Sequence, residues 1–299
     1  MQTNIKSIIG LIVITIILIP ILSCKSVVDE LQNETRWDKA ALFELNKLNW
    51  EEGQGSFEGG KIAVVAKDEK TGAMAFYLQM PPKGLEDAHG GRLHSHTGTS
   101  HTLVIKGSVS AIVGGKEMTM KEGEYFRLPA GFLHKGSIIP GPDPTIMFMV
   151  TDGSFDLEYA KEGEEEMPLT SDLNQKDIAQ PALFTMDNLE WQKGEGSFEG
   201  GMYATVCNDP ENGINIMFLD MPPKEYSESH EGRSHSHSGL SHSILLKGTI
   251  KAKIGGEELT MNPGDYFRAP AGFEHVGSHV PGPDHAIVMM ITEGGFDVN

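Results

Sequence analysis

Two short stretches of this chain place histidines at the same spacing. HSHTGTSH spans residues 94–101, and HSHSGLSH spans residues 235–242. In a β-strand, residues two apart point to the same side. The first two histidines of each stretch can therefore bring two imidazoles to one point. Neutral imidazole is the commonest metal ligand in proteins and suits iron, zinc, copper and nickel. Each stretch thus predicts part of a metal site.

A third histidine follows a turn-forming segment farther along each half of the chain. GEYFRLPAGFLH ends at His134, and GDYFRAPAGFEH ends at His275. A histidine on a second strand would complete a facial set of three ligands around one ion. The predicted metal ligands are therefore His94, His96 and His134 in the first half and His235, His237 and His275 in the second.

The sequence leaves two alternatives for a fourth ligand in each half. Ser100 and His101 are neighbours, as are Ser241 and His242. A strand turns only one of two neighbours toward a given face. We expect His101 and His242 to face the metal, which predicts four histidine ligands at each site. The alternative is three histidines with open coordination positions beside the serine.

The two histidine stretches belong to an internal repeat. Trp50 matches Trp191, an offset of 141 residues, and the same offset aligns GSFEGG at 55–60 with GSFEGG at 196–201. Between the copies lies the acidic segment 161–180, which is poor in apolar residues and has the composition of a linker. We therefore expect two copies of one domain.

Short apolar runs fill each copy. KIAVVAKD, AMAFYLQM and TIMFMVTDG are examples, with β-branched, aromatic and methionine side chains between turn residues. Runs of this length predict strands, and only residues 37–44 offer a short helix. The 35 glycines and 16 prolines among 299 residues agree with many turns. Each copy is therefore predicted to be an all-β sandwich or barrel.

One turn motif resembles a known family. Gly123, Pro129, Gly131 and His134 have the spacing G-x5-P-x-G-x2-H, and the second copy repeats it. This pattern resembles the second motif of the cupin superfamily, and H-x-H followed by a strand that ends in Lys-Gly resembles the first. The resemblance implies small jelly-roll barrels with a metal in the mouth of each. The chain is thus similar to a bicupin, with two tandem cupin-type jelly-roll β-barrels.

Several residues near these motifs depart from the pattern or have an open role. The first motif of the family usually carries a glutamate ligand, where this chain has the serine–histidine pairs described above. His89 and His230 lie in polar loops, and we expect them at the surface, with a position beside the metal ligands or in a lid as the alternative. Arg127 and Arg268 lie on the strand before each PAGF turn. Two alternatives remain for these arginines, namely lining the pocket or facing solvent.

The N-terminus has the composition of an export signal. An early lysine precedes an apolar run of about 15 residues, Ile8–Leu22, and the run closes on a serine and Cys24. This ending resembles a bacterial lipobox, in which Cys24 receives lipid. We therefore expect an exported protein, lipid-anchored at a bacterial membrane and facing the periplasm or the cell surface. An ordinary secretory signal or an uncleaved anchor is the alternative.

These observations predict an organisation in five parts. They are a lipoprotein-type signal peptide at 1–24, a tether at 25–45, a first cupin domain at 46–160, an acidic linker at 161–180 and a second cupin domain at 181–299.

The net charge of the chain makes one class of binding partner unlikely. A formal net charge of −18 gives an acidic surface that repels phosphate backbones, so we expect no nucleic-acid partner. The expected partners are a small-molecule substrate or ligand and the membrane, through the lipid anchor. A homodimer is a further alternative.

The residues favour a metal-dependent enzyme that acts on a small organic substrate. One divalent transition metal per domain is expected, iron or zinc first, with manganese and nickel as alternatives. A redox metal would support dioxygenase-like chemistry, and a Lewis-acid metal would polarise a carbonyl. A non-catalytic cupin that binds or senses a metal or a small ligand is the alternative, because the fold alone hosts many chemistries. Because imidazole must be deprotonated to bind, we expect metal occupancy to fall below about pH 6.

Overall fold

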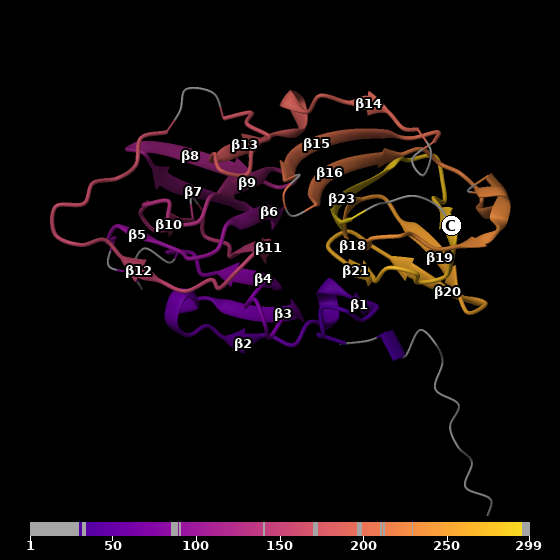
Figure 1. The fold of residues 1–299 in the computed structure, drawn as a ribbon, viewed down its shortest axis with the longest axis horizontal. Coiled ribbons are helices and arrows are strands. Elements are labelled where there is room, and N and C mark those ends of the chain that lie inside the picture. The colour runs from indigo at the N-terminus through magenta and orange to yellow at the C-terminus, as the bar shows by residue number, and fades with distance from the viewer. Residues whose placement is uncertain are drawn as a thin grey trace, which may run out of the picture.

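The protein is described here from a computed structural model (Figure 1). The described residues are 30–294 apart from 32–33, 85–88, 90, 140, 170–172, 196–198, 210, 212 and 229. The predicted signal peptide with Cys24 lies outside them, and so does the side chain of His230. In the part of the chain that the structure describes, no helix has the length and hydropathy needed to cross a membrane.

Two β-barrels lie side by side, one from each half of the sequence (Figure 1). In each barrel a seven-stranded sheet faces a smaller one. Apolar side chains such as Phe76 and Val104 fill the space between the sheets of the first barrel. Leu219 and Leu245 belong to the matching cluster of the second. The prediction of two tandem all-β jelly-roll barrels is confirmed.

The two large sheets have the same strand order relative to the repeat. In the first barrel the order is β13 (Ala182–Phe184), β9 (Tyr125–Leu128), β6 (Ser100–Lys106), β11 (Thr145–Thr151), β4 (Met74–Met80), β3 (Lys61–Lys67) and β2 (Glu51–Glu52). In the second it is β1 (Ala41–Phe43), β21 (Tyr266–Ala269), β18 (Leu240–Lys247), β23 (Ala286–Glu293), β16 (Ile214–Met221), β15 (Met202–Asp209) and β14 (Gln192–Lys193). All neighbouring strands are antiparallel.

The smaller sheets close the opposite side of each barrel. In the first barrel they are β10 (Ser137–Ile138), β7 (Ser108–Val113) and β8 (Lys116–Lys121), with the separate pair β12 (Glu158–Tyr159) and β5 (His94–Ser95). In the second they are β17 (Ser234–His235), β22 (His275–His279), β19 (Ile250–Ile254) and β20 (Glu257–Met261). The short 3-10 helices are η1 (Leu45–Lys47), η2 (Gly55–Phe57), η3 (Met186–Asn188), η5 (Tyr226–Glu228) and η6 (His230–Gly232).

The strand that leads into each half belongs to the sheet of the other half. β1 pairs with β21 of the second barrel, and β13 pairs with β9 of the first. The prediction of a short helix over 37–44 is wrong, because residues 41–43 form the exchanged strand, which is buried at the edge of the second large sheet. Each barrel therefore takes the edge strand of its large sheet from across the predicted domain boundary.

The outer faces of the two large sheets pack against each other. Tyr77, Leu103 and Phe148 from the first half join Phe218 and Ile244 from the second in one buried cluster. The hydroxyl of Tyr77 also donates a hydrogen bond of 2.6 Å to the backbone carbonyl of Gly264 in the other barrel. One buried apolar cluster thus contains side chains from both barrels, so we expect the two barrels to unfold together rather than as independent domains.

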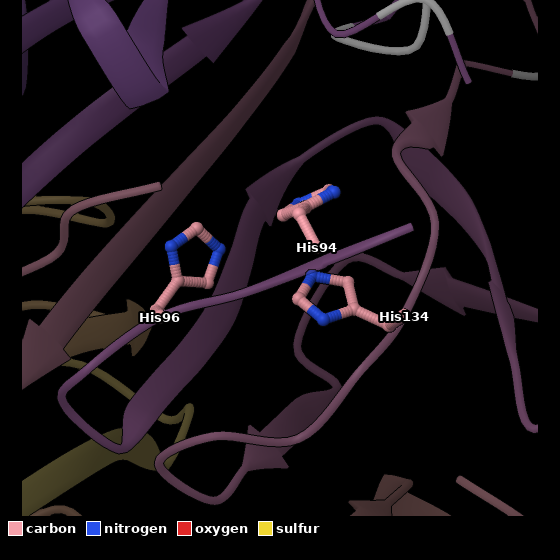
Figure 2. A group of neighbouring side chains, drawn as sticks. All are labelled: His94, His96 and His134. Carbon is pink, nitrogen blue, oxygen red and sulfur yellow. The ribbon is translucent and has the colours of Figure 1, made fainter. Parts of the chain in front are cut away.

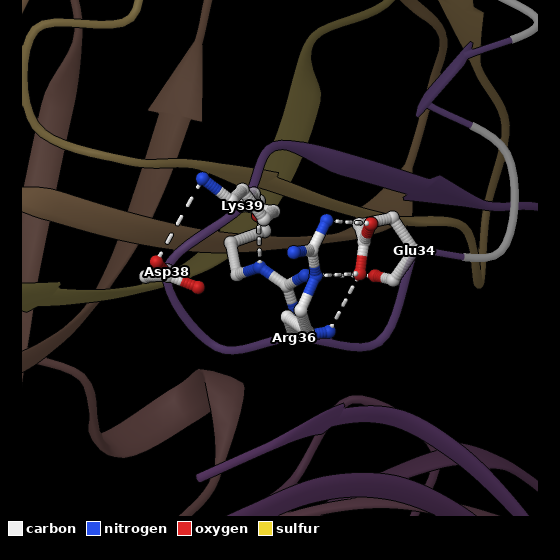
Figure 3. Close-up of polar contacts among 5 residues, drawn as sticks. Glu34, Arg36, Asp38 and Lys39 are labelled. Carbon is white, nitrogen blue, oxygen red and sulfur yellow. Dashed lines mark hydrogen bonds and ion pairs between the residues drawn. The ribbon is translucent and has the colours of Figure 1, made fainter.

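Two buried arginines tie the exchanged segments in place. Arg268 donates hydrogen bonds to the backbone carbonyls of Glu34, Lys39 and Val65, all of which lie in the first half of the chain. The lead-in segment is further folded by the ion pair of Arg36 with Glu34, which lie side by side in Figure 3. The hydrogen bonds from Arg36 hold the pKa of Glu34 well below its ordinary value, at about 2.

Arg127 repeats this arrangement in the opposite direction. Its guanidinium donates to the carbonyls of Gln175, Asp177, Gln180 and Val206, each beyond the first barrel in sequence. Both arginines are fully buried. The two alternatives considered from sequence, pocket lining and solvent exposure, are therefore both wrong. A guanidinium has five N–H donors in a fixed fork, which allows it to satisfy several carbonyls at once.

Candidate metal centre

Backbone pairing brings the distant histidine beside the H-x-H motif. The N–H of His94 donates to the carbonyl of His134, and the N–H of His134 donates back, both at 2.9 Å. The N–H of Gly131 donates to the carbonyl of His96 at 2.8 Å. Gly131 has a φ of +72°, which favours glycine at this turn. In the second barrel, Gly272 bonds the carbonyl of the matching histidine at the same 2.8 Å.

The three imidazoles of each predicted triad converge. In the first barrel the ring centres of His94 and His134 lie 4.4 Å apart, and His96 lies 5.3 Å and 5.4 Å from them. Figure 2 shows the three rings turned toward a common space. The second triad has ring separations of 4.5, 5.2 and 5.2 Å. One nitrogen from each ring lies within 4.8 Å of the others in both triads.

Hydrogen bonds to the backbone orient the rings. A carbonyl can only accept, so a ring nitrogen that bonds one must carry the proton. The Nδ1 atoms of the first triad donate to the carbonyls of Arg92, Phe132 and Asp156. In the second triad, His235 and His275 donate to the carbonyls of Arg233 at 3.3 Å and Phe273 at 3.1 Å. Nε2 is thereby left as the lone-pair nitrogen, which is the form that binds metal.

Burial keeps the first triad neutral. Desolvation lowers the pKa of His96 to about 4 and that of His134 to about 3, and it also lowers the pKa of His94. The neighbouring imidazoles of the triad act in the same direction, because a second positive charge would repel the first. At neutral pH these rings are ready to coordinate without losing a proton.

The donor set fits a divalent transition metal. Imidazole–metal bonds of about 2.1 Å place two nitrogens on one ion no more than about 4.2 Å apart. The nitrogen–nitrogen distances of 4.8 Å or less in each triad are close to this limit. Small movements of the rings would therefore bring all three nitrogens within bonding distance of one ion. Three neutral imidazoles suit iron, zinc, manganese or nickel and leave coordination positions open. One such group exists in each barrel.

The expectation that His101 and His242 complete the site needs correction. Their side chains point to the opposite face of the large sheet, into the interface between the barrels. His101 Nδ1 shares a hydrogen bond of 2.7 Å with the hydroxyl of Tyr125, and His242 Nδ1 shares one of 2.6 Å with Tyr266. Because side chains alternate along a strand, it is the preceding serine that lines the cavity in each barrel.

His89 is placed differently from the sequence expectation. It is buried, lines the first cavity, and its ring centre lies 5.2 Å from that of His94. A backbone hydrogen bond with Ser56 is one of its contacts, and burial lowers its pKa. The expected surface position is therefore wrong for His89, and the alternative of a position beside the metal ligands fits these contacts.

Phe155 is a site residue that sequence reasoning did not single out. Its ring stacks on the imidazole of His96 with the centres 3.9 Å apart, and it lines the first cavity. The segment that follows β11 therefore covers one side of the first triad. The repeat contained a signal, since Phe155-Asp156 recurs as Phe296-Asp297; the second pair lies outside the described residues.

Each triad opens into a cavity inside its barrel. The cavity of the second barrel has a volume of about 140 Å³, and that of the first about 80 Å³. Methionine, leucine and valine side chains line both cavities, and Ile250 also lines the second. Ser100 and Ser241 contribute hydroxyls beside the triads. The arrangement can hold an ion at one end of a largely apolar chamber. A cavity of about 150 Å³ is large enough for benzene, and the second cavity approaches this volume whereas the first does not.

Two protein families match the chain. The ChrR cupin-like domain matches residues 38–156, and the cupin domain matches residues 217–292. Each match contains or overlaps one triad together with the strands that position it. No curated protein sequence matches this chain significantly.

Solved structures share the fold at low sequence identity. A candidate dioxygenase from Nostoc punctiforme is 17% identical with a TM-score of 0.64, covering 86% of this chain and 83% of its own. Protein Ylba from E. coli is 13% identical with a TM-score of 0.58, covering 92% and 99%. The oxalate decarboxylase of Lactobacillus farciminis, in complex with formate, is 13% identical with a TM-score of 0.51, covering 86% and 87%. At such identities the likeness concerns the fold.

Proposed function

We infer the function of this chain from the premise that it is a bicupin, a chain built of two cupin domains. We propose that it is a metal-dependent enzyme acting on a small organic substrate, with one divalent transition metal per barrel. The observation that carries this proposal is the pair of matched triads, His94/His96/His134 and His235/His237/His275. Each sits at a cavity and has open positions on its metal-facing side.

A metal held there supplies a Lewis acid or, if it is redox-active, a site for dioxygenase-like chemistry. The protein's own groups prepare the site. The carbonyls of Arg92, Phe132 and Asp156 hold the imidazoles in the ligating tautomer. The apolar walls exclude water, which strengthens electrostatic interactions with a bound substrate. Ser100 and Ser241 offer hydroxyls to a polar group of that substrate.

Metal content tests the proposal. The full chain would be purified in detergent and measured by mass spectrometry, beside His94→Ala/His96→Ala and His235→Ala/His237→Ala. We expect about two ions per chain in the wild type and the loss of one in each variant. A wild type that stays empty after reloading with iron, zinc, manganese and nickel would end the metalloprotein proposal. Oxygen uptake and product formation with a panel of small organic acids then test catalysis.

A non-catalytic role in binding or sensing is the second candidate. One observation favours it for the first barrel, where the cavity is small and Phe155 stacks directly on a ligand ring. A binder would take up metal or ligand stoichiometrically without turnover. Measuring product formation in each single-site variant separates the two candidates barrel by barrel.

We also propose that the mature protein is lipid-anchored through Cys24. The support is the sequence alone, an apolar run that closes on a small residue and a cysteine. Cys24→Ala should leave the protein without incorporated radiolabelled fatty acid and should block signal cleavage. A wild-type protein that carries no label after growth with labelled palmitate would contradict the proposal.

A further inference from the structure

The cavities of the two barrels are not equivalent. Leu128 lines the first cavity where Ala269 lines the second, and Met147 lines the first where Val288 lines the second. Both differences remove side-chain atoms from the second barrel. Ile250 of the second cavity is larger than its counterpart Val109, yet the second cavity is the larger of the two, about 140 Å³ against about 80 Å³. The second cavity therefore has room for a small organic molecule beside its triad.

Among the described residues, the second cavity is lined by a cation that has no counterpart in the lining of the first. The carboxylate of Asp220 also lines the second cavity, and it pairs with His285 at 2.6 Å. Lys224 lines the second cavity together with the three histidines and is partly buried. Its repeat partner, Lys83, is exposed and is not among the residues that line the first cavity. Both lysines end the same MPPK sequence, and the next residue is Gly84 in the first barrel and Glu225 in the second. Gly84 has a φ of +70°, which favours glycine.

The backbone after MPPK explains the difference. The N–H of Lys224 donates to the carbonyl of Val280 at 3.2 Å, and the N–H of Val280 donates back at 2.9 Å. This bridge ties Lys224 to the rim of the smaller sheet, just after β22. In the first barrel the chain turns instead, because the N–H of Gly84 donates to the carbonyl of Pro81 at 2.7 Å. Lys83 lies within that turn and faces solvent.

The surroundings of Lys224 leave its charge incompletely compensated. Desolvation lowers the pKa of its ammonium group, and Glu228 is the acidic group that opposes this effect. Within the described residues, no carboxylate forms an ion pair with Lys224. A partly desolvated ammonium at the wall of an apolar cavity is stabilised by an anion that enters the cavity.

We propose that the second cavity binds a small organic anion, with a carboxylate at Lys224 and a short apolar body along the methionine, leucine and isoleucine walls. This proposal rests on the proposed function in that it places the substrate beside the second triad. It makes Lys224 a residue that selects the substrate and makes the second barrel the site of turnover. The first barrel, without such a cation and with a smaller cavity, does not bind this class of molecule.

Calorimetric titration of the full chain with butyrate and with its uncharged isostere butyramide tests the proposal. Lys224→Met keeps the apolar stem of the side chain and removes the charge, and Lys224→Arg keeps the charge. Lys83→Met is the matched control in the other barrel. We expect Lys224→Met to weaken butyrate binding about tenfold or more, the effect of one charge-assisted hydrogen bond. Lys224→Arg should retain most of the affinity, and Lys83→Met should bind like the wild type.

Two further measurements separate the loss of charge recognition from misfolding of a variant. Butyramide should bind weakly and equally to the wild type and Lys224→Met, because it offers no charge. Circular dichroism checks that each variant is folded. The proposal is overturned if the wild type does not bind butyrate, or if Lys224→Met binds it as well as the wild type. Metal content measured on the same samples reports separately on the proposed function, since Lys224 can bind a carboxylate whether or not the triad is loaded.

Discussion

The guanidinium of Arg268, in the second barrel, donates a hydrogen bond of 3.0 Å to the backbone carbonyl of Val65, in the first. Arg127 makes the matching bond of 3.2 Å to the carbonyl of Val206. Arg268 and Val65 are 203 residues apart in sequence, and Arg127 and Val206 are 79 residues apart. The same offset of 141 residues nevertheless relates one pair to the other. The two barrels are therefore held by a pseudo-symmetric pair of clamps that also bind the exchanged lead-in segments.

Removing one clamp should destabilise the whole chain. Arg268→Met keeps the side-chain bulk but removes the donor from one buried and two partly buried hydrogen bonds, which should cost about 2–3 kcal/mol. Urea unfolding followed by tryptophan fluorescence should show a lower midpoint. Arg233→Met is the control, since Arg233 is exposed and pairs only with Glu231, and its effect should stay below about 0.5 kcal/mol. Equal midpoints for the two variants would refute the clamp.

His101 should not be needed for metal binding, because its ring lies on the far side of the sheet from the triad. His101→Gln should therefore retain about one ion in the first barrel. His134→Gln should lose that ion, because it removes one of three ligands. Metal content is measured on folded protein after gel filtration, with the second triad removed by His235→Ala/His237→Ala. If His101→Gln lost as much metal as His134→Gln, the hypothesis of a four-histidine site would be supported again.

The first site should hold metal at a lower pH than free imidazoles would. Three independent histidines with an ordinary pKa of about 6.5 would lose about 10⁴-fold in affinity between pH 7 and pH 5. Burial lowers the pKa values of His96 and His134 to about 4 and about 3, so these two rings stay neutral at pH 5. Burial also lowers the pKa of His94, so the loss in affinity should stay below the change of about 25-fold that one ordinary imidazole would cause. This replaces the threshold of about pH 6 expected from sequence. Competition titration at pH 7, 6 and 5 measures the metal affinity of the first site at each pH.

The interface histidines should make the fold sensitive to acid. Burial lowers the pKa of His101 and of His242 to about 3, whereas the unfolded chain binds protons near pH 6.5. The unfolded state therefore holds more protons, and stability present above pH 6.5 is lost progressively as the pH falls toward 3. The urea midpoint should drop from pH 7 to pH 5 in the wild type and drop less in His101→Asn/His242→Asn. If the urea midpoint fell by the same amount in the wild type and the variant, other groups would control the loss of stability in acid.

Much of this protein could be predicted from local features of the sequence. The strands follow from short apolar runs between turn residues, and the repeat follows from one constant offset. The triads follow from H-x-H and a histidine after the PAGF turn, because residues two apart on a strand share a face whatever surrounds them. The structure brings His94, His96 and His134 together as that spacing predicts.

Tertiary structure decided what depends on register and on contacts between distant segments. A shift of one residue exchanges the two faces of a strand, so only the assembled sheet turns Ser100 toward the cavity and His101 away from it. The exchange of β1 and β13 joins segments from opposite halves of the chain, which no local pattern encodes. The same holds in part for Lys224, since its MPPK sequence recurs at Lys83 and only the following residue differs, Glu225 in place of Gly84. Its place at the cavity depends on a backbone bridge to Val280, which forms only when the second barrel has folded.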